Sequence, residues 1–221
     1  LAEDEPNGLL AVGGDLSPLR LIAAYRRGVF PWYSEHEPIL WWSPDPRTVL
    51  FPNKVKISRS LRKTLRKGLF QVSFDRAFKQ VIRACSEPRK DSPSTWLVPE
   101  MIHAYEQLHE LGLAHSVEVW QGGQLVGGLY GVAIGGVFFG ESMFSQASDS
   151  SKVALVRLCE HLLLWDIKMI DCQVYTQHLI SLGALEIPWE DFCNHLDNWC
   201  NVPGKLGLWS SVIPASTSLH E

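Results

Sequence analysis

The sequence contains none of the short motifs that identify the commonest nucleophilic, nucleotide-binding and metal-dependent enzymes. There is no GxSxG elbow, no P-loop and no dinucleotide-binding fingerprint, and the histidines show neither HxxxH nor HExxH spacing. Covalent catalysis by an activated serine and a metal centre therefore have no support, and no cofactor is expected.

Long apolar runs and closely spaced cysteines are also missing. No stretch of about 18 uncharged apolar residues occurs, so no membrane span is expected. The five cysteines form no CxxC pair and several stand among apolar residues, which is typical of reduced core residues and favours the cytosol. Glu3, Asp4 and Glu5 stand where a secretory signal would be positively charged.

Charge is unevenly distributed along a chain of ordinary globular composition. The net charge of −4 argues against a nucleic-acid partner. One segment argues for such a partner, because it has no acidic residue and contains Lys54, Lys56, Arg59, Arg62, Lys63, Arg66 and Lys67. Like charges this close repel one another unless a polyanion or solvent relieves them, so phosphate binding and a solvated face both fit.

Turn residues and periodicity predict a small N-terminal unit. Ser17, Pro18 and Gly28 are placed to begin and end a helix. The proline- and tryptophan-rich stretch that follows is interpreted as an irregular connection that closes the unit near residue 46. We therefore expect a small domain at residues 1–46 and a larger one at residues 47–221.

The order of elements in the larger unit predicts a mixed sheet. Short strands flank a basic helix over residues 59–67, and helices begin near Asp75 and at Pro99. Strands on both sides of Gly122-Gly123 form a predicted hairpin, followed by strand GVFFGESMFS, helix KVALVRLCEHLLLW, buried strand IKMIDCQVY and helix TQHLISLGA. An antiparallel meander and a β-α-β crossover give an α+β fold, a mixed sheet flanked by helices, which suits the GNAT-type N-acetyltransferase superfamily.

Two predicted strands carry polar residues suited to chemistry. Asp171 and Gln173 lie two apart, which places both on one face of a strand and allows Asp171 to orient the Gln173 carboxamide. A polar pair buried only for local hydrogen bonding fits the same spacing. Glu141, in FFGESMF, either bonds backbone donors where strands splay or faces a pocket and receives a substrate ammonium or hydroxyl group.

Several tryptophans fall in loop-like sequence rather than in a predicted element. They are Trp32, Trp41, Trp42 and Trp96. Indoles in such places stack on a base or form the wall of a pocket, and core packing is the ordinary alternative.

A resemblance is carried by segments that run in order from Glu5 to about Pro188. They are EPNGLLAVGGDLSP, RGVFPWYS, PILWWSPDPR, ISRS, LHELGLAHSVEVW, LVGGLYGV, GESMFS, DCQV and HLISLGALEIP. Together they resemble the leucyl/phenylalanyl-tRNA–protein transferase family. The resemblance implies a small N-terminal domain, an acyltransferase-like domain and a monomer. It also implies transfer of Leu or Phe, less often Met, from its tRNA to proteins that begin with Arg or Lys, which marks them for degradation.

The resemblance also implies site residues. Trp32 and Trp96 correspond to aromatic walls around the terminal adenosine of the aminoacyl-tRNA. The apolar pocket for the aminoacyl side chain is implied at Leu129, Phe138, Met143, Leu158 and Ile170. At Leu129 and Leu158 the family has the larger Met and Phe. Contacts with the tRNA acceptor stem are implied at Arg59, Arg62, Lys63, Arg66 and Lys67.

The implied chemistry fits the missing nucleophile. An aminoacyl ester is already activated, so a free amine attacks it directly once the two are aligned. Our hypothesis is that Asp171 polarises Gln173, whose carbonyl oxygen holds the attacking amine. Glu141 anchors the amino group of the aminoacyl moiety or braces the pocket. A vicinal ribose hydroxyl is available to carry the proton, because an amide is a very poor base.

Two other functions stay open at this point. An acyl-CoA-dependent N-acyltransferase of the same fold would have a glycine-rich loop before its central helix, but FSQASDSSKVAL contains no glycine. A tRNA-binding adaptor without catalysis would use the basic segment and the tryptophans, and would need none of Glu141, Asp171 and Gln173.

Overall fold

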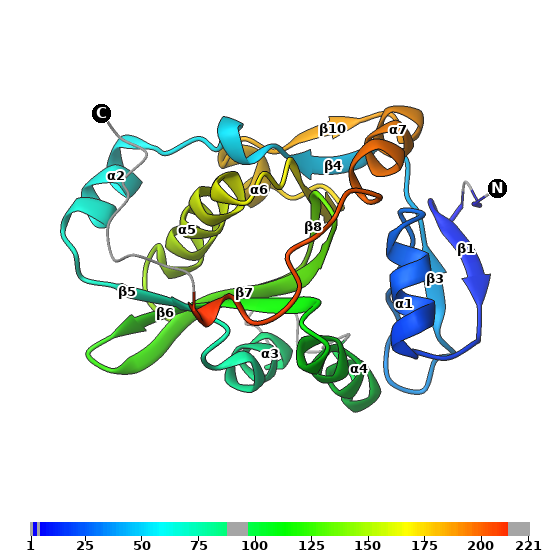
Figure 1. The fold of residues 1–221 in the computed structure, drawn as a ribbon, viewed down its shortest axis with the longest axis horizontal. Coiled ribbons are helices and arrows are strands. Elements are labelled where there is room, and N and C mark those ends of the chain that lie inside the picture. The colour runs from blue at the N-terminus through cyan, green and yellow to red at the C-terminus, as the bar shows by residue number, and fades with distance from the viewer. Residues whose placement is uncertain (1, 4, 88–96, 212–221) are drawn as a thin grey trace.

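The structure is a computed structural model that describes residues 2–3, 5–87 and 97–211 of the chain. It contains a small three-stranded sheet and a larger seven-stranded mixed sheet (Figure 1). Among the described residues, no helix is both long enough and apolar enough to span a membrane. Trp96 lies outside the described residues.

The small sheet is antiparallel and forms near the N-terminus. Across the sheet its strands are β1 (Leu9–Val12), β3 (Leu40–Trp42) and β2 (Phe30–Pro31). Helix α1 (Pro18–Tyr25) contacts β2 and is followed by Gly28 at a φ of 71°. The prediction of an irregular connection after Gly28 is thus wrong in part, since two of these strands are too short to show a period of two. The domain boundary near residue 46 stays a prediction.

The large sheet has one parallel pair of neighbours, β8 and β9. Across the sheet the strands are β10 (Leu185–Ile187), β4 (Arg47–Leu50), β9 (Met169–Gln173), β8 (Val137–Ser145), β7 (Gln124–Ile134), β6 (Ala114–Gln121) and β5 (Gln71–Phe74). All other neighbours are antiparallel. The predicted meander, crossover and mixed sheet of an α+β protein are therefore confirmed.

Helices cover both faces of this sheet (Figure 1). They are α2 (Arg59–Arg66), α3 (Phe78–Ser86), α4 (Pro99–Glu110), α5 (Ser150–Leu164), α6 (Gln177–Ser181) and α7 (Trp189–Trp199), with short 3-10 turns at Pro52–Lys54 and Trp209–Ser211. Helices α3 and α4 lie on one face and α5 lies on the other. Strand β10 and helix α7 were not predicted.

The alternation of side chains along the central strands separates two cores. Tyr130 and Phe139 belong to the core that α3 and α4 complete, whereas Leu129 and Phe138 belong to the core around α5. Tyr25 of α1 is part of the first of these cores. The N-terminal unit therefore shares its core with the large sheet.

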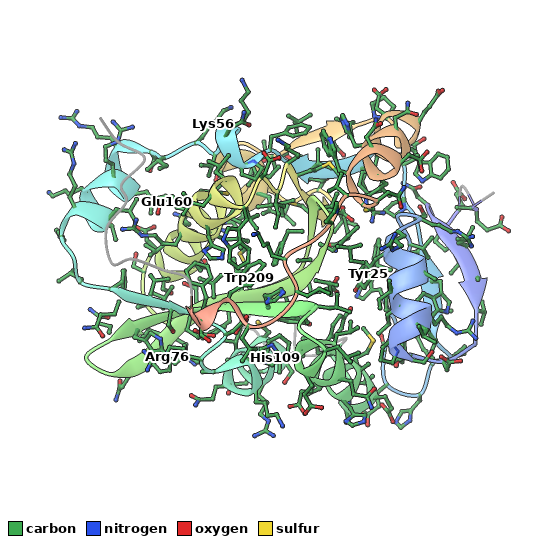
Figure 2. All side chains as sticks on the ribbon, in the orientation of Figure 1. Tyr25, Lys56, Arg76, His109, Glu160 and Trp209 are labelled. Atoms are coloured by element: carbon green, nitrogen blue, oxygen red, sulfur yellow. The ribbon has the colours of Figure 1, made fainter. Side chains whose placement is uncertain are left out.

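The second core is completed by a segment far along the chain. Trp209, labelled in Figure 2, is fully buried. Its indole stacks on the His115 ring with 3.9 Å between centroids. Its backbone N–H donates to Asp75 Oδ2 at 2.7 Å, and the same oxygen lies 2.8 Å from His115 Nδ1. The sequence pattern of this tail did not predict its docking.

Candidate active site

A cavity of about 920 Å³ lies where β8 and β9 separate. The two strands pair only from Val137 to Phe139 of β8, although β8 continues to Ser145. The cavity wall contains all members of the predicted apolar pocket: Leu129, Phe138, Met143, Leu158 and Ile170. Aliphatic and aromatic side chains are the ligands that such a wall accommodates.

Glu141 enters this cavity from an irregularity in β8. Tyr130 of β7 pairs with Ser142, and Gly131 pairs with Gly140, so Glu141 is an additional residue between the two pairs. An additional residue of this kind is a β-bulge, which redirects a side chain from its regular position. The Glu141 side chain lines the cavity.

Two tyrosine hydroxyls hold the Glu141 carboxylate. Tyr25 donates to Oε1 at 2.7 Å and Tyr105 of α4 donates to Oε2 at 2.6 Å. Figure 2 shows Tyr25 reaching from α1 towards the large sheet. Burial raises the pKa of the Glu141 carboxyl to about 7, although both hydrogen bonds act in the opposite direction. Burial also raises the pKa of both tyrosines well above its usual value, so they stay protonated donors.

Of the two predicted surroundings of Glu141, the structure has the one that faces a pocket. Its hydrogen-bond donors are side-chain hydroxyls rather than the backbone groups of splayed strands. A carboxyl group with a pKa near neutrality changes charge under ordinary conditions. That property suits a group that meets a substrate ammonium.

Asp171 is fully buried on the other side of β9 and does not line the cavity. Arg47 of β4 forms a two-point ion pair with it, with Nε–Oδ1 at 2.8 Å and Nη2–Oδ2 at 2.7 Å. The guanidinium lies between the rings of Phe30 and Phe192, 4.9 and 4.6 Å from their centroids. Both charges are thus held rigidly away from water.

The predicted hydrogen bond between the side chains of Asp171 and Gln173 is not formed. Asp171 Oδ1 instead accepts from the backbone N–H of Gln173 at 2.9 Å. Gln173 has a φ of 59°, so the extended alternation ends there, and its side chain lines the cavity together with Ile170 and Cys172. The predicted shared face is therefore wrong. Gln173 Nε2 is buried and has no hydrogen-bond partner among the described residues, which leaves it available to a ligand.

The basic helix α2 lies at the end of the molecule far from α1 (Figure 1). Ser58 Oγ caps it by accepting from the Leu61 N–H, and Thr64 donates to Asp149 beside the start of α5. The outward face is exposed and, in the described part of the chain, makes no ion pair; it carries Arg59, Arg62, Lys63, Arg66 and Lys67. The predicted helix is confirmed, and its contact with tRNA stays a prediction.

Trp32 lies apart from the residues that line the cavity. Trp32 is 46% exposed, and its ring packs against that of Trp42, with ring centroids 5.8 Å apart. Trp41 is buried in the first core, which agrees with the alternative of core packing. Because Trp96 lies outside the described residues, the pair of aromatic walls around an adenosine stays a prediction.

Three residues of the site were not predicted as functional: Arg47, Tyr25 and Tyr105. The tyrosines stood at apolar positions of helices, where a buried hydroxyl requires a partner. Arg47 precedes the apolar run TVLF, and a cation at that position requires a carboxylate. The sequence thus indicated that each of these polar groups needs a partner, but it did not indicate which residue that partner is.

Comparison with known proteins identifies a family to which most of the chain is similar. The family described as leucyl/phenylalanyl-tRNA protein transferase matches residues 49–197, and the one described as its N-terminal domain matches residues 14–45. Proteins named leucyl/phenylalanyl-tRNA–protein transferase are similar to the chain. The one from Aromatoleum aromaticum is 60% identical over 98% of this chain and 92% of its own length. The one from Cellvibrio japonicus is 55% identical over 97% and 92%.

A solved structure, that of L-PGS from Bacillus licheniformis, is a more distant match. It is 10% identical to this chain, with a TM-score of 0.40 over 75% of this chain and 55% of its own. An identity and a TM-score this low do not show a shared role.

Proposed function

Because the chain belongs to the leucyl/phenylalanyl-tRNA protein transferase family, we propose that it moves Leu or Phe, less often Met, from aminoacyl-tRNA to proteins that begin with Arg or Lys. The observation that carries this proposal is the cavity in which an apolar wall, Glu141 and Gln173 lie together. We further propose that it acts in the cytosol as a monomer and that the added residue marks the acceptor for degradation.

The apolar wall selects the donor. Leu, Phe and Met side chains differ by a few methylene equivalents, which such a wall discriminates by only about 1–3 kcal/mol, so the three overlap. Charged donor side chains are excluded more firmly, because they would lose their hydration without gaining a partner. Glu141, held by Tyr25 and Tyr105, binds the α-ammonium of the aminoacyl moiety.

Gln173 positions the incoming amine at the ester. Its carbonyl oxygen accepts a hydrogen bond from the amine, whose nitrogen attacks the ester carbonyl carbon. The bond from that carbon to the ribose oxygen then breaks, and the nitrogen's proton passes to the departing oxygen through the neighbouring ribose hydroxyl. Alignment of this kind lowers the activation free energy by several kcal/mol, and it needs no covalent enzyme intermediate. Arg47 and Asp171 hold the Gln173 backbone in place.

The two ends of the donor bind at separate places. The exposed cations of α2 bind acceptor-stem phosphates, and Trp32, with Trp96, stacks on the terminal adenosine. Phosphate contacts make binding depend on salt, so replacing Arg62 by Gln should weaken tRNA binding and reduce the slope of log Kd against log salt by about one.

The decisive experiment is transfer of radiolabelled Leu from Leu-tRNA to a protein with N-terminal Arg, beside the same protein with N-terminal Ala. We expect label on the Arg protein alone. Asp-tRNA serves as the matched control donor, and it should label neither protein.

The other outcomes separate the alternatives. No transfer with tight tRNA binding would identify a non-catalytic adaptor, and no transfer without tRNA binding would redirect the search to acyl-CoA donors. Near-normal single-turnover transfer by Gln173→Ala would show that Gln173 has no part in holding the amine.

A further inference from the structure

The last described segment of the chain brings one buried side chain to the large sheet. After α7, residues 201–208 run back towards β5 (Figure 1), and all of them are exposed. Trp209 follows them and is fully buried. Helices and strands of a core bury side chains at regular intervals along their length. A long exposed segment that delivers a single indole to the interior is a different arrangement, so the place of that indole calls for its own explanation.

The indole of Trp209 is held by several neighbours besides Asp75, which accepts its backbone N–H, and the stacked ring of His115. The Trp165 ring meets it edge-on with centroids 5.1 Å apart, and the His161 ring lies 4.9 Å away. Its own Nε1–H is buried and makes no hydrogen bond within the described residues. An unused buried donor costs stability, so this side chain contributes through the size and shape of its ring system.

A further neighbour of the indole is Phe138, a member of the apolar wall of the first cavity. The two ring centroids are 5.8 Å apart. Phe138 is fully buried and lines the cavity, whereas Trp209 does not line it. Both belong to the core around α5. Protein interiors are close-packed and yield little, so a side chain that supports a wall limits how far that wall can move.

We propose that Trp209 is a positioning residue that sets the depth of the aminoacyl pocket by holding Phe138 in place. While the indole is present, Phe138 has no room to withdraw when a larger donor side chain enters. This inference rests on the proposed transfer of Leu and Phe. It makes the balance between those two donors depend on a residue that lies outside the cavity.

The test is transfer from Leu-tRNA and from Phe-tRNA to one peptide that begins with Arg. The ratio of the two kcat/KM values does not depend on the fraction of enzyme that is folded, so it separates positioning from stability. Trp209→Leu leaves room behind Phe138. We expect it to shift the ratio about tenfold towards Phe-tRNA, the lower end of what one methylene group is worth in an apolar pocket. Trp209→Phe retains a ring and should shift the ratio less.

Two further variants connect the effect to Phe138. Phe138→Leu removes the ring that Trp209 supports, so its shift and that of Trp209→Leu should not add in the double variant. Trp41→Leu is the matched control, because Trp41 is also a buried tryptophan but belongs to the other core and does not line the cavity. It should leave the ratio unchanged, even if it lowers stability.

A wild-type ratio in both Trp209 variants, with transfer from the two donors reduced equally or not at all, would overturn the proposal and leave Trp209 a structural residue. If Trp209→Leu does not fold, the ratio in Trp209→Phe decides alone. Additive shifts in the double variant would show that Trp209 does not act through Phe138. Failure of the wild type to transfer from either donor would instead overturn the proposed function, a result distinct from an unchanged ratio.

Discussion

Two carboxylates beside one cavity are stabilised in opposite ways. Asp171 has a full positive charge against it, from the guanidinium of Arg47, and both groups are fully buried. Glu141 forms no ion pair within the part of the chain that the structure describes; the hydroxyls of Tyr25 and Tyr105 hold it, and burial raises its pKa to about 7. The first carboxylate is therefore a fixed part of the framework, whereas the second is poised to change its charge.

The difference follows from what surrounds each group. Arg47 is confined between two aromatic rings, so its pair with Asp171 cannot rearrange when a substrate arrives. Glu141 lies on a bulge in the cavity wall, where a ligand ammonium supplies the missing counter-charge. A buried carboxylate that is paired with a cation of the protein fixes the local structure, whereas one without such a cation is suited to bind a cationic ligand.

Replacing Arg47 by Met should have the largest effect, because it leaves the Asp171 carboxylate buried without a counter-charge. Removing one partner of a buried pair costs about 3–5 kcal/mol in the free energy of unfolding, which urea denaturation measures. Arg47→Met with Asp171→Leu removes both charges and should regain most of that stability. Transfer should stay low, because the Gln173 N–H loses its acceptor. Full recovery of transfer would remove this pair from the mechanism.

Replacing Glu141 by Gln should lower single-turnover transfer about tenfold to hundredfold, the equivalent of one hydrogen bond to a charged group. It should also change stability with a definite sign. Folding raises the pKa of Glu141 from 4.5 to about 7, so the wild type loses stability as pH rises through that interval. The variant has no such loss, so its stability relative to the wild type should increase between pH 5 and pH 8. A constant difference would contradict the assignment.

Replacing Tyr105 by Phe should have a smaller effect, confined to pH dependence. The hydrogen bond from Tyr105 lowers the pKa of Glu141, so its loss moves that pKa above 7. If ionised Glu141 binds the donor's ammonium, the rise of single-turnover transfer with pH should shift upward by about one unit. Val117→Ile, at a buried site that does not line the cavity, is a control for altered packing and should leave the profile in place.

Replacing Arg20 by Met should have the smallest effect. Arg20 pairs with Asp15 at 3.0 Å, but both side chains are about half exposed. Exposed pairs contribute little, so the urea midpoint should stay within the scatter of repeats. The same substitution is thus made in a buried pair and in an exposed one. A large decrease in the urea midpoint of Arg20→Met would mean that burial does not explain the difference between the two ion pairs.

The sequence was informative where a local pattern decides the structure. The strands on both sides of Gly122-Gly123 and the helix from Pro99 to Glu110 follow from alternation, turn residues and helix boundaries. The small sheet was missed because strands such as Phe30–Pro31 are too short for any period to show. Only pairing with distant residues makes them strands.

The geometry of the site was less predictable for the same reason. Arg47 and Asp171 are 124 positions apart, and no local rule pairs them. The left-handed φ of Gln173 could not be read from DCQV, and it is what moved that side chain away from the face of Asp171. The bulge at Glu141 likewise depends on the register between β7 and β8.

The position of Trp209 has a consequence for the order in which the chain matures. Among the described residues it follows every other member of the core around α5 in the sequence, and its indole contacts the rings of Phe138 and His115. During synthesis from the N-terminus, this part of the interior stays open until the segment that contains Trp209 emerges. A polypeptide interrupted before residue 209 would expose apolar surface and be recognisable as incomplete.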